Sequence, residues 1–172
     1  LFNHIDIKKE NIHIPKGNLS VSEIQKHCIQ YEKKIEKAGG IDLQLLGIGR
    51  NGHIGFNEPG SLESSITRKV TIDNKTRVDA SHEFGSIENV PKKAISMGIN
   101  TILNAKKIIL IAWGENKRKV VKKAVEEKIN DLVPASFLQN HNNTQFILDS
   151  ESAADLNRFT CPWAYRDIGN YL

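Results

Sequence analysis

The chain has 172 residues, of which 39% are hydrophobic and 26% are charged, so it is long enough to bury a core and close to the average composition of globular domains. Its formal net charge is only +4, and no apolar run reaches the roughly 20 residues of a membrane-spanning helix. These features exclude a transmembrane helix in this sequence and predict a single compact domain.

The first six residues, from Leu1 to Asp6, lack the charged start and the apolar stretch of a signal peptide, so we expect a cytoplasmic protein. The chain does not begin with methionine, and we expect it to be part of a longer protein. Its two cysteines, Cys28 and Cys161, lie far apart, which suggests neither a zinc site nor a disulfide framework. We therefore expect no metal and no organic cofactor.

Much of the positive charge belongs to residues 117–123, where Lys and Arg alternate with apolar positions as on an amphipathic helix. No aromatic-rich or recognition motif accompanies this segment, so a solvated helix face is favoured over a nucleic-acid surface. The mild basicity also suits an anionic small molecule. We expect a small-molecule partner rather than a nucleic acid or a membrane.

The first predicted element is a helix that starts after Ser20, because residues 20–23 form a capping box of Ser and Glu. Apolar residues then recur at three- and four-residue intervals up to the glycines at 39–40: Val21, Ile24, Cys28, Tyr31 and Ile35. The short, mostly apolar run at 41–48 ends in glycine and is typical of a buried strand in a parallel sheet.

The pattern repeats in the second half of the chain. Further elements are predicted as a strand at 94–99, a short helix at 100–105, a buried strand at 107–113, a helix at about 115–129, a short helix at 134–139 and a strand at 144–149. The inner face of the helix at 115–129 is predicted to carry Val120, Val121, Ala124, Val125 and Ile129. Such alternation predicts an α/β fold with a largely parallel sheet.

The whole chain, residues 1–172, is predicted to form one α/β domain, with 150–172 as a tail of uncertain structure. Within this tail, residues 150–156 are a weak helix candidate and 160–165 are expected to be extended.

The densest group of reactive residues follows the predicted strand at 41–48, where ligands bind in open α/β sheets. This loop has glycines at 47, 49, 52 and 55, and between them lie Asn51 and His53, followed by Glu58. An imidazole exchanges a proton near neutral pH, so His53 is the natural acid and base, and Glu58 or Asn51 can orient it. From spacing alone, a structural glycine-rich turn with a hydrogen-bonded histidine is the alternative.

Residues 46–60 read Leu-Gly-Ile-Gly-Arg-Asn-Gly-His-Ile-Gly-Phe-Asn-Glu-Pro-Gly. This segment closely resembles the signature of glucosamine-6-phosphate deaminases. The related 6-phosphogluconolactonases share the Gly-x-Gly-x-x-Gly-His skeleton but not the Gly-Phe-Asn-Glu-Pro continuation. The resemblance covers roughly residues 1–149 and includes the segments 76–77, 90–99, 101–103, 114–117 and 134–136.

The resemblance implies a Rossmann-like, open and largely parallel sheet with flanking helices, of which this chain is the C-terminal two-thirds. It also implies a cofactor-independent enzyme of amino-sugar catabolism, which converts glucosamine 6-phosphate and water into fructose 6-phosphate and ammonia through ring opening and aldose–ketose isomerisation. Family members carry a phosphate loop and a base aspartate ahead of the matched region, and neither is in this sequence. We therefore expect the isolated chain to have little or no activity.

The family's catalytic residues match His53, Glu58 and Asn51, although many members have Asp at the last position. An amide can orient His53 but cannot stabilise its cation as a carboxylate does. The substrate-binding positions match Gly52 and Lys117, the latter as a phosphate contact.

Two further basic residues are candidates for the substrate phosphate. His82 stands where the family has a phosphate-binding arginine, and Arg77 is a substitute for that arginine.

Other functions stay open at this point. Galactosamine 6-phosphate is an alternative substrate, and a non-catalytic sugar-phosphate-binding regulator is an alternative function. Ser61 and Arg68 match an allosteric sugar-phosphate site of some members, but Val70 replaces its lysine, and the two residues also fit an ordinary loop. Since the family contains monomers and larger assemblies, the sequence is compatible with a homo-oligomer.

Overall fold

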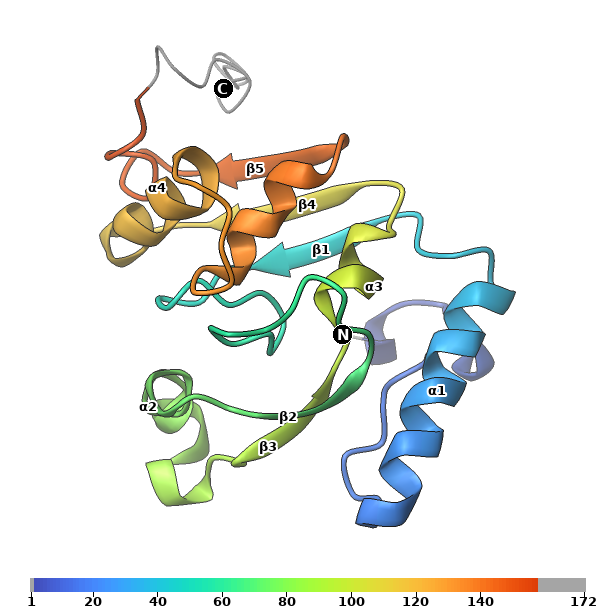
Figure 1. Ribbon diagram of the computed structural model, residues 1–172. Coiled ribbons are helices and arrows are strands. Elements are labelled where there is room, and N and C mark those ends of the chain that lie inside the picture. Colours follow the sequence, from blue (N-terminus) through green and yellow to red (C-terminus); the bar gives the residue numbers. More distant parts are fainter. Residues whose placement is uncertain (1, 158–172) are drawn as a thin grey trace.

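The computed structural model describes residues 2–157 and contains a three-stranded parallel sheet (Figure 1). Its strands are β1 (Gln44–Gly47), β4 (Ile108–Ala112) and β5 (Thr144–Leu148), in the order β1-β4-β5. Ile108 of β4 pairs with Gln44 on one side and with Thr144 on the other. The predicted α/β fold with a largely parallel sheet is confirmed.

The hydrophobic core lies between this sheet and three helical segments within residues 99–140. These are α3 (Ile99–Leu103), α4 (Arg118–Glu126) and the 3₁₀ helix η5 (Pro134–Asn140), which appear on one side of the sheet in Figure 1. The best-buried core residues are Ile54, Ile99, Ile102, Ile108, Leu110, Val121, Ala124, Ala135 and Leu138. β4 buries every second residue, as expected for a strand with one face on the core.

The predicted burial of the whole strand at 41–48 is wrong. β1 is a shorter strand at an edge of the sheet, and its residues are alternately buried and exposed. Leu46 faces the core, whereas Leu43 and Leu45 are 54% and 60% exposed. The apolar residues of this run therefore lie on two faces of the strand. One face packs against the core, and the described residues leave the other uncovered.

A second, antiparallel sheet pairs β2 (Arg68–Thr71) with β3 (Lys93–Ser96). The 17-residue helix α1 (Val21–Lys37) packs against β2, and the predicted capping box is present, with the Ser20 backbone N–H donating to Glu23 Oε2 at 3.1 Å. Farther along α1, Glu32 Oε1 accepts hydrogen bonds of 2.7 Å from the Thr67 backbone N–H and from Thr101 Oγ1. This one carboxylate ties α1 to the start of β2 and to α3.

Helix α2 (Asn74–Phe84) was not predicted from the sequence. It starts at Asp73, whose Oδ1 accepts from the Lys75 backbone N–H at 2.8 Å, and it ends at Gly85, which has a left-handed φ of 78°. The helix buries none of its residues, so it has no apolar stripe that would reveal it. The short 3₁₀ helix η3 (Ile87–Asn89) follows it.

Other differences concern the helix expected at 115–129, the C-terminal segment and the turns before α1. The helix expected at 115–129 consists of the 3₁₀ turn η4 (Glu115–Lys117) and α4, so Ile129 lies beyond its end, although the other four predicted inner-face residues are buried. Residues 150–156 form turns instead of a helix, and the segment 160–165 with Cys161 lies outside the described residues. Two 3₁₀ turns, η1 (Phe2–His4) and η2 (Lys9–Asn11), precede α1. Within residues 2–157, no helix combines the length and hydropathy of a membrane span.

Replacement of Gly98 by Ala is expected to lower the free energy of unfolding by about 1–3 kcal/mol. A Cβ at this position would lie 2.1 Å from the Ser65 carbonyl oxygen, a backbone atom that also accepts from the Asn100 N–H at 2.9 Å. Gly17→Ala is the control, because a Cβ there has no neighbour within 4 Å. Urea unfolding measures both variants, and equal stabilities would contradict the steric argument.

Candidate active site

The loop after β1 folds back on itself through its glycines. The Gly49 N–H donates to the His53 carbonyl at 3.0 Å, and the Gly52 N–H donates to the Gly49 carbonyl at 2.9 Å. Gly52 has a φ of 88° and its carbonyl accepts from the Ala135 N–H, while a Cβ on Gly49 would lie 2.1 Å from the His53 ring. Glycine is required at both positions, and this turn sets the position of the imidazole.

Three polar side chains meet in this loop, as the sequence predicted. His53 Nδ1 lies 2.8 Å from Asn51 Oδ1 and 3.3 Å from Glu58 Oε2. Asn51 Nδ2 donates to the same Glu58 oxygen at 2.7 Å. The side chains of His53 and Glu58 are only 16% and 12% exposed, so the group is largely shielded from water.

Glu58 carries a negative charge in this arrangement. Its burial raises its pKa, but hydrogen bonds from His53, Asn51 and Thr76 outweigh this effect and hold the pKa at about 2. The other carboxylate oxygen, Oε1, accepts from the Asp73 backbone N–H at 3.1 Å. Both oxygens of the carboxylate are therefore held by donors.

The ionised Glu58 determines the proton positions of its neighbours. Because a carboxylate only accepts hydrogen bonds, Asn51 must turn its NH₂ group towards Glu58 and its oxygen towards His53 Nδ1. An amide oxygen is also an acceptor, so Nδ1 must carry the proton. In the neutral imidazole, Nε2 then keeps the lone pair and is the basic nitrogen.

Helix α2 adds residues that the sequence analysis missed. Thr76 Oγ1 lies 3.2 Å from His53 Nδ1. Asp79, one turn farther along α2, binds the Arg50 guanidinium through both of its oxygens, with Nε donating to Oδ2 at 2.9 Å. The cap at Asp73 and Gly85 is the signal that could have revealed the helix. Two side chains of α2 thus join it to the loop at 49–58.

Lys117 lies beside the same loop, at the start of α4. Its ammonium donates to the Ile48 carbonyl at 2.8 Å, directly after β1. Burial lowers the pKa of Lys117, the charge of Asp79 raises it, and the charge of Arg50 lowers it. These electrostatic contacts bring Lys117 and the Arg50–Asp79 pair into one charged group.

The two other candidate phosphate ligands lie differently. Arg77 points to the turn after α2, where its guanidinium donates to the Ile87 carbonyl at 2.7 Å and to the Val90 carbonyl at 3.4 Å. His82 is exposed on α2, three positions after Asp79. The structure therefore brings neither of them into contact with His53.

Ser61 and Arg68 are engaged in a network within the fold. The Arg68 guanidinium donates to Asn57 Oδ1 at 2.8 Å and to Ser61 Oγ at 3.1 Å. Asn57 is fully buried and donates to the Ile54 and Met97 carbonyls at 2.9 and 2.8 Å. This network supports a structural role for both residues, with Ser61 in the loop and Arg68 in β2.

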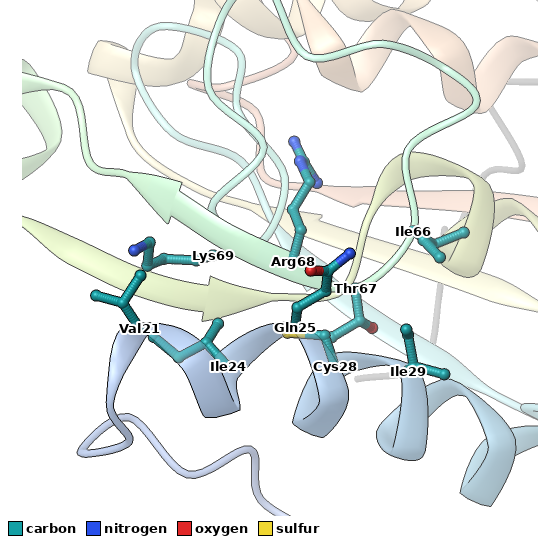
Figure 2. Close-up of a pocket in the computed structure, with 9 residues that line it drawn as sticks. All are labelled: Val21, Ile24, Gln25, Cys28, Ile29, Ile66, Thr67, Arg68 and Lys69. Atoms are coloured by element: carbon teal, nitrogen blue, oxygen red, sulfur yellow. The ribbon is translucent and has the colours of Figure 1, made fainter.

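A cavity of about 410 Å³ lies elsewhere, between α1 and β2 (Figure 2). Its α1 wall is made of Val21, Ile24, Cys28 and Ile29 together with Gln25, and none of its nine lining residues is His, Asp or Glu. Burial and the charge of Glu32 raise the pKa of the Cys28 thiol, so it is not an activated nucleophile. This cavity therefore offers no carboxylate or imidazole, in contrast to the loop at 49–58. Within residues 2–157, no group of three or more His, Cys, Asp or Glu could hold a metal ion.

Comparisons with known proteins agree on one family. A family model of glucosamine-6-phosphate isomerases and 6-phosphogluconolactonases matches residues 1–147. The chain is 54% identical over 156 residues to the glucosamine-6-phosphate deaminase of Clostridium novyi and 53% identical over 157 residues to that of Clostridium botulinum, with 91% of this chain covered in each case. A glucosamine-6-phosphate deaminase-like protein of Bacteroides thetaiotaomicron is 50% identical over 163 residues, which cover 95% of this chain.

These relatives are longer than the chain. It spans 64% of the two clostridial deaminases and 25% of the Bacteroides protein. A solved monomeric glucosamine-6-phosphate deaminase superposes with a TM-score of 0.86 at 44% identity, over 90% of this chain and 64% of that one. A 6-phosphogluconolactonase from Trypanosoma cruzi has a TM-score of 0.63 at 25% identity, over 81% of this chain and 54% of that one.

Glu58→Gln is expected to lower the free energy of unfolding at neutral pH. The folded-state pKa of Glu58 is about 2, compared with an ordinary value of 4.5. A carboxyl whose pKa falls on folding stabilises the fold above its unfolded pKa, and this contribution is lost as the pH falls through the folded value. The stability difference between wild type and variant should therefore shrink as the pH drops from 4.5 towards about 2. Urea unfolding at a series of pH values measures it, and a constant difference would contradict the assignment.

Proposed function

The chain belongs to the family of glucosamine-6-phosphate isomerases and 6-phosphogluconolactonases, and on this premise we propose that the protein is a glucosamine-6-phosphate deaminase. It would convert glucosamine 6-phosphate and water into fructose 6-phosphate and ammonia, as a step of amino-sugar catabolism in the cytoplasm. Support comes from relatives of that name at more than 50% identity and from the fold shared with a solved deaminase.

The observation that carries the proposal is the proton arrangement around His53. Its Nδ1–H is held by Asn51 Oδ1 at 2.8 Å, which leaves Nε2 as a base. Opening of the pyranose ring needs a group that takes the proton from the C1 hydroxyl and returns one to the ring oxygen. His53 Nε2 can do both, because an imidazole gains and loses a proton near neutral pH.

Glu58 would stabilise the protonated form of His53. Its carboxylate is ionised and lies 3.3 Å from Nδ1, so an imidazolium formed during ring opening has a counterion in a shielded site. Asn51 supplies orientation without charge, which leaves the electrostatic role to Glu58. After ring opening, transfer of hydrogen from C2 to C1 gives a C2 imine, and its hydrolysis releases ammonia.

Lys117 would bind the substrate phosphate. Its ammonium is anchored to the Ile48 carbonyl, and two further N–H bonds remain for an anion. Gly52 belongs to the adjacent turn, where its missing side chain permits close approach of a ligand. His82 is the second proposed phosphate contact, because it is exposed on α2. Arg77 is less suited, since two backbone carbonyls already bind its guanidinium.

His53→Ala is expected to lower kcat by about 10²- to 10⁴-fold, the range that a general acid–base residue contributes. The measurement is a coupled assay of fructose 6-phosphate formation by the full-length protein, with glucosamine and galactosamine 6-phosphates compared. His13→Ala, at an exposed histidine away from the loop, should keep wild-type activity. An inactive wild type that still binds the sugar phosphate would favour the regulator, and hydrolysis of 6-phosphogluconolactone would favour the lactonase branch of the family.

Lys117→Ala is expected to raise KM for glucosamine 6-phosphate about tenfold or more, because a hydrogen bond to a charged group contributes about 1.5–3 kcal/mol. Lys119→Ala is the matched control, since Lys119 is an exposed lysine two positions along α4. The same coupled assay gives both constants. Unchanged KM in the Lys117 variant would remove this residue from the phosphate site.

A further inference from the structure

We propose that Thr76 is a positioning residue of the reaction, whose hydroxyl holds the His53 ring beside the Glu58 carboxylate in the orientation that proton transfer requires. This inference rests on the proposed function, because it concerns the same site. Thr76 lies on α2, an element with no sequence signature of a catalytic role, and its side chain is partly buried.

The first observation is the place of the hydroxyl between the two partners. Thr76 Oγ1 lies 3.2 Å from His53 Nδ1, and the Thr76 side chain also lowers the pKa of Glu58. Because Nδ1 carries one proton, which Asn51 Oδ1 accepts at 2.8 Å, the hydroxyl oxygen of Thr76 shares that proton while its own hydrogen can point towards the carboxylate. One side chain thus contacts both members of the acid–base pair.

The second observation is the weak direct contact within that pair. His53 Nδ1 and Glu58 Oε2 are 3.3 Å apart, longer than the 2.8 Å contact of Nδ1 with Asn51 Oδ1. Within residues 2–157, Glu58 is the one carboxylate that forms an ion pair with His53. The stabilisation of an imidazolium therefore depends on how firmly this carboxylate is held.

The third observation is that Glu58 is held mainly from α2 and from Asn51. The Asp73 backbone N–H binds Oε1 at 3.1 Å, and Asn51 Nδ2 binds Oε2 at 2.7 Å. Neither of these two hydrogen bonds involves His53. Thr76 adds a contact with the His53 ring, and the Arg50–Asp79 pair attaches α2 to the loop independently. Loss of the Thr76 hydroxyl should therefore loosen the pair without detaching the helix.

The test uses four forms of the full-length protein: wild type, Thr76→Val, Thr76→Ser and Ser81→Ala. Val keeps the shape of Thr but lacks the hydroxyl, Ser keeps the hydroxyl, and Ser81 is the control because its Oγ donates only to the Val78 carbonyl of the same helix. Fructose 6-phosphate formation gives kcat and KM. Thr76→Val should lose about 10- to 100-fold in kcat with KM within about threefold of wild type, whereas Ser retains most of kcat.

A second readout does not depend on turnover. Carbon-13 NMR of the Glu58 carboxyl follows its titration, and Thr76→Val should raise the titration midpoint because the carboxylate loses a donor, whereas Thr76→Ser should leave it close to wild type. The ionisable group that faces Glu58 within the described residues is His53, and both variants retain it. If Thr76→Val is poorly folded by circular dichroism, Thr76→Ala supplies the same comparison.

The outcomes separate this inference from the proposed function. An inactive wild type contradicts the proposed function, and the NMR titration then decides on Thr76: an unchanged midpoint in Thr76→Val overturns its contact with Glu58, and a raised midpoint upholds it. If the wild type is active, full kcat in Thr76→Val overturns the inference. An equal loss in the Val and Ser variants, or a change in KM alone, overturns it as well.

Discussion

The candidate site depends on one largely shielded negative charge, the carboxylate of Glu58. An ionised group away from water is costly unless hydrogen bonds replace its hydration. Asn51, Thr76 and the Asp73 backbone supply those bonds, and each is thereby constrained in its own orientation. The oxygen of the Asn51 amide then faces His53, so Nδ1 of the imidazole must donate a hydrogen bond to it. The position of one charge thus sets the basic nitrogen of the imidazole, and with it the chemistry that the loop can perform.

A second network keeps the loop in place around that charge. Asn57 next to Glu58 is fully buried, and its amide is bound by Arg68 and by the carbonyls of Ile54 and Met97. These partners come from β2, from the end of β3 and from the loop itself. The antiparallel sheet therefore supports the loop, whereas the cavity on its α1 side in Figure 2 is lined by no His, Asp or Glu.

The sequence predicted the parts of the fold that carry periodic or terminal signals. The capping box at Ser20 and the apolar period after it located α1, and the buried alternation of β4 and the apolar face of α4 were visible as patterns. The proximity of Asn51, His53 and Glu58 followed from their short spacing. Helix α2 was missed because its burial is too slight to leave a period, and Thr76 and Asp79 were missed with it.

Side-chain direction was equally invisible in the sequence. Lys117 came from family resemblance and lies beside the loop, while Arg77 came from the same source and binds the carbonyls of the turn after α2. A long, flexible side chain can reach several places from one backbone position, and tertiary contacts select among them. The exposed face of β1 was missed for a similar reason, because an apolar run in a sequence does not show which elements cover each face of the strand.

The bridging carboxylate of Glu32 has a consequence for the order in which the molecule assembles. Its two partners, Thr67 and Thr101, lie 35 and 69 positions later in the sequence. Helix α1 can begin to form by itself, because its capping box and its apolar period lie within residues 20–37. It gains the hydrogen bonds of Glu32 only after two long chain loops have closed. Complete docking of α1 therefore requires both β2 and α3 to be in place.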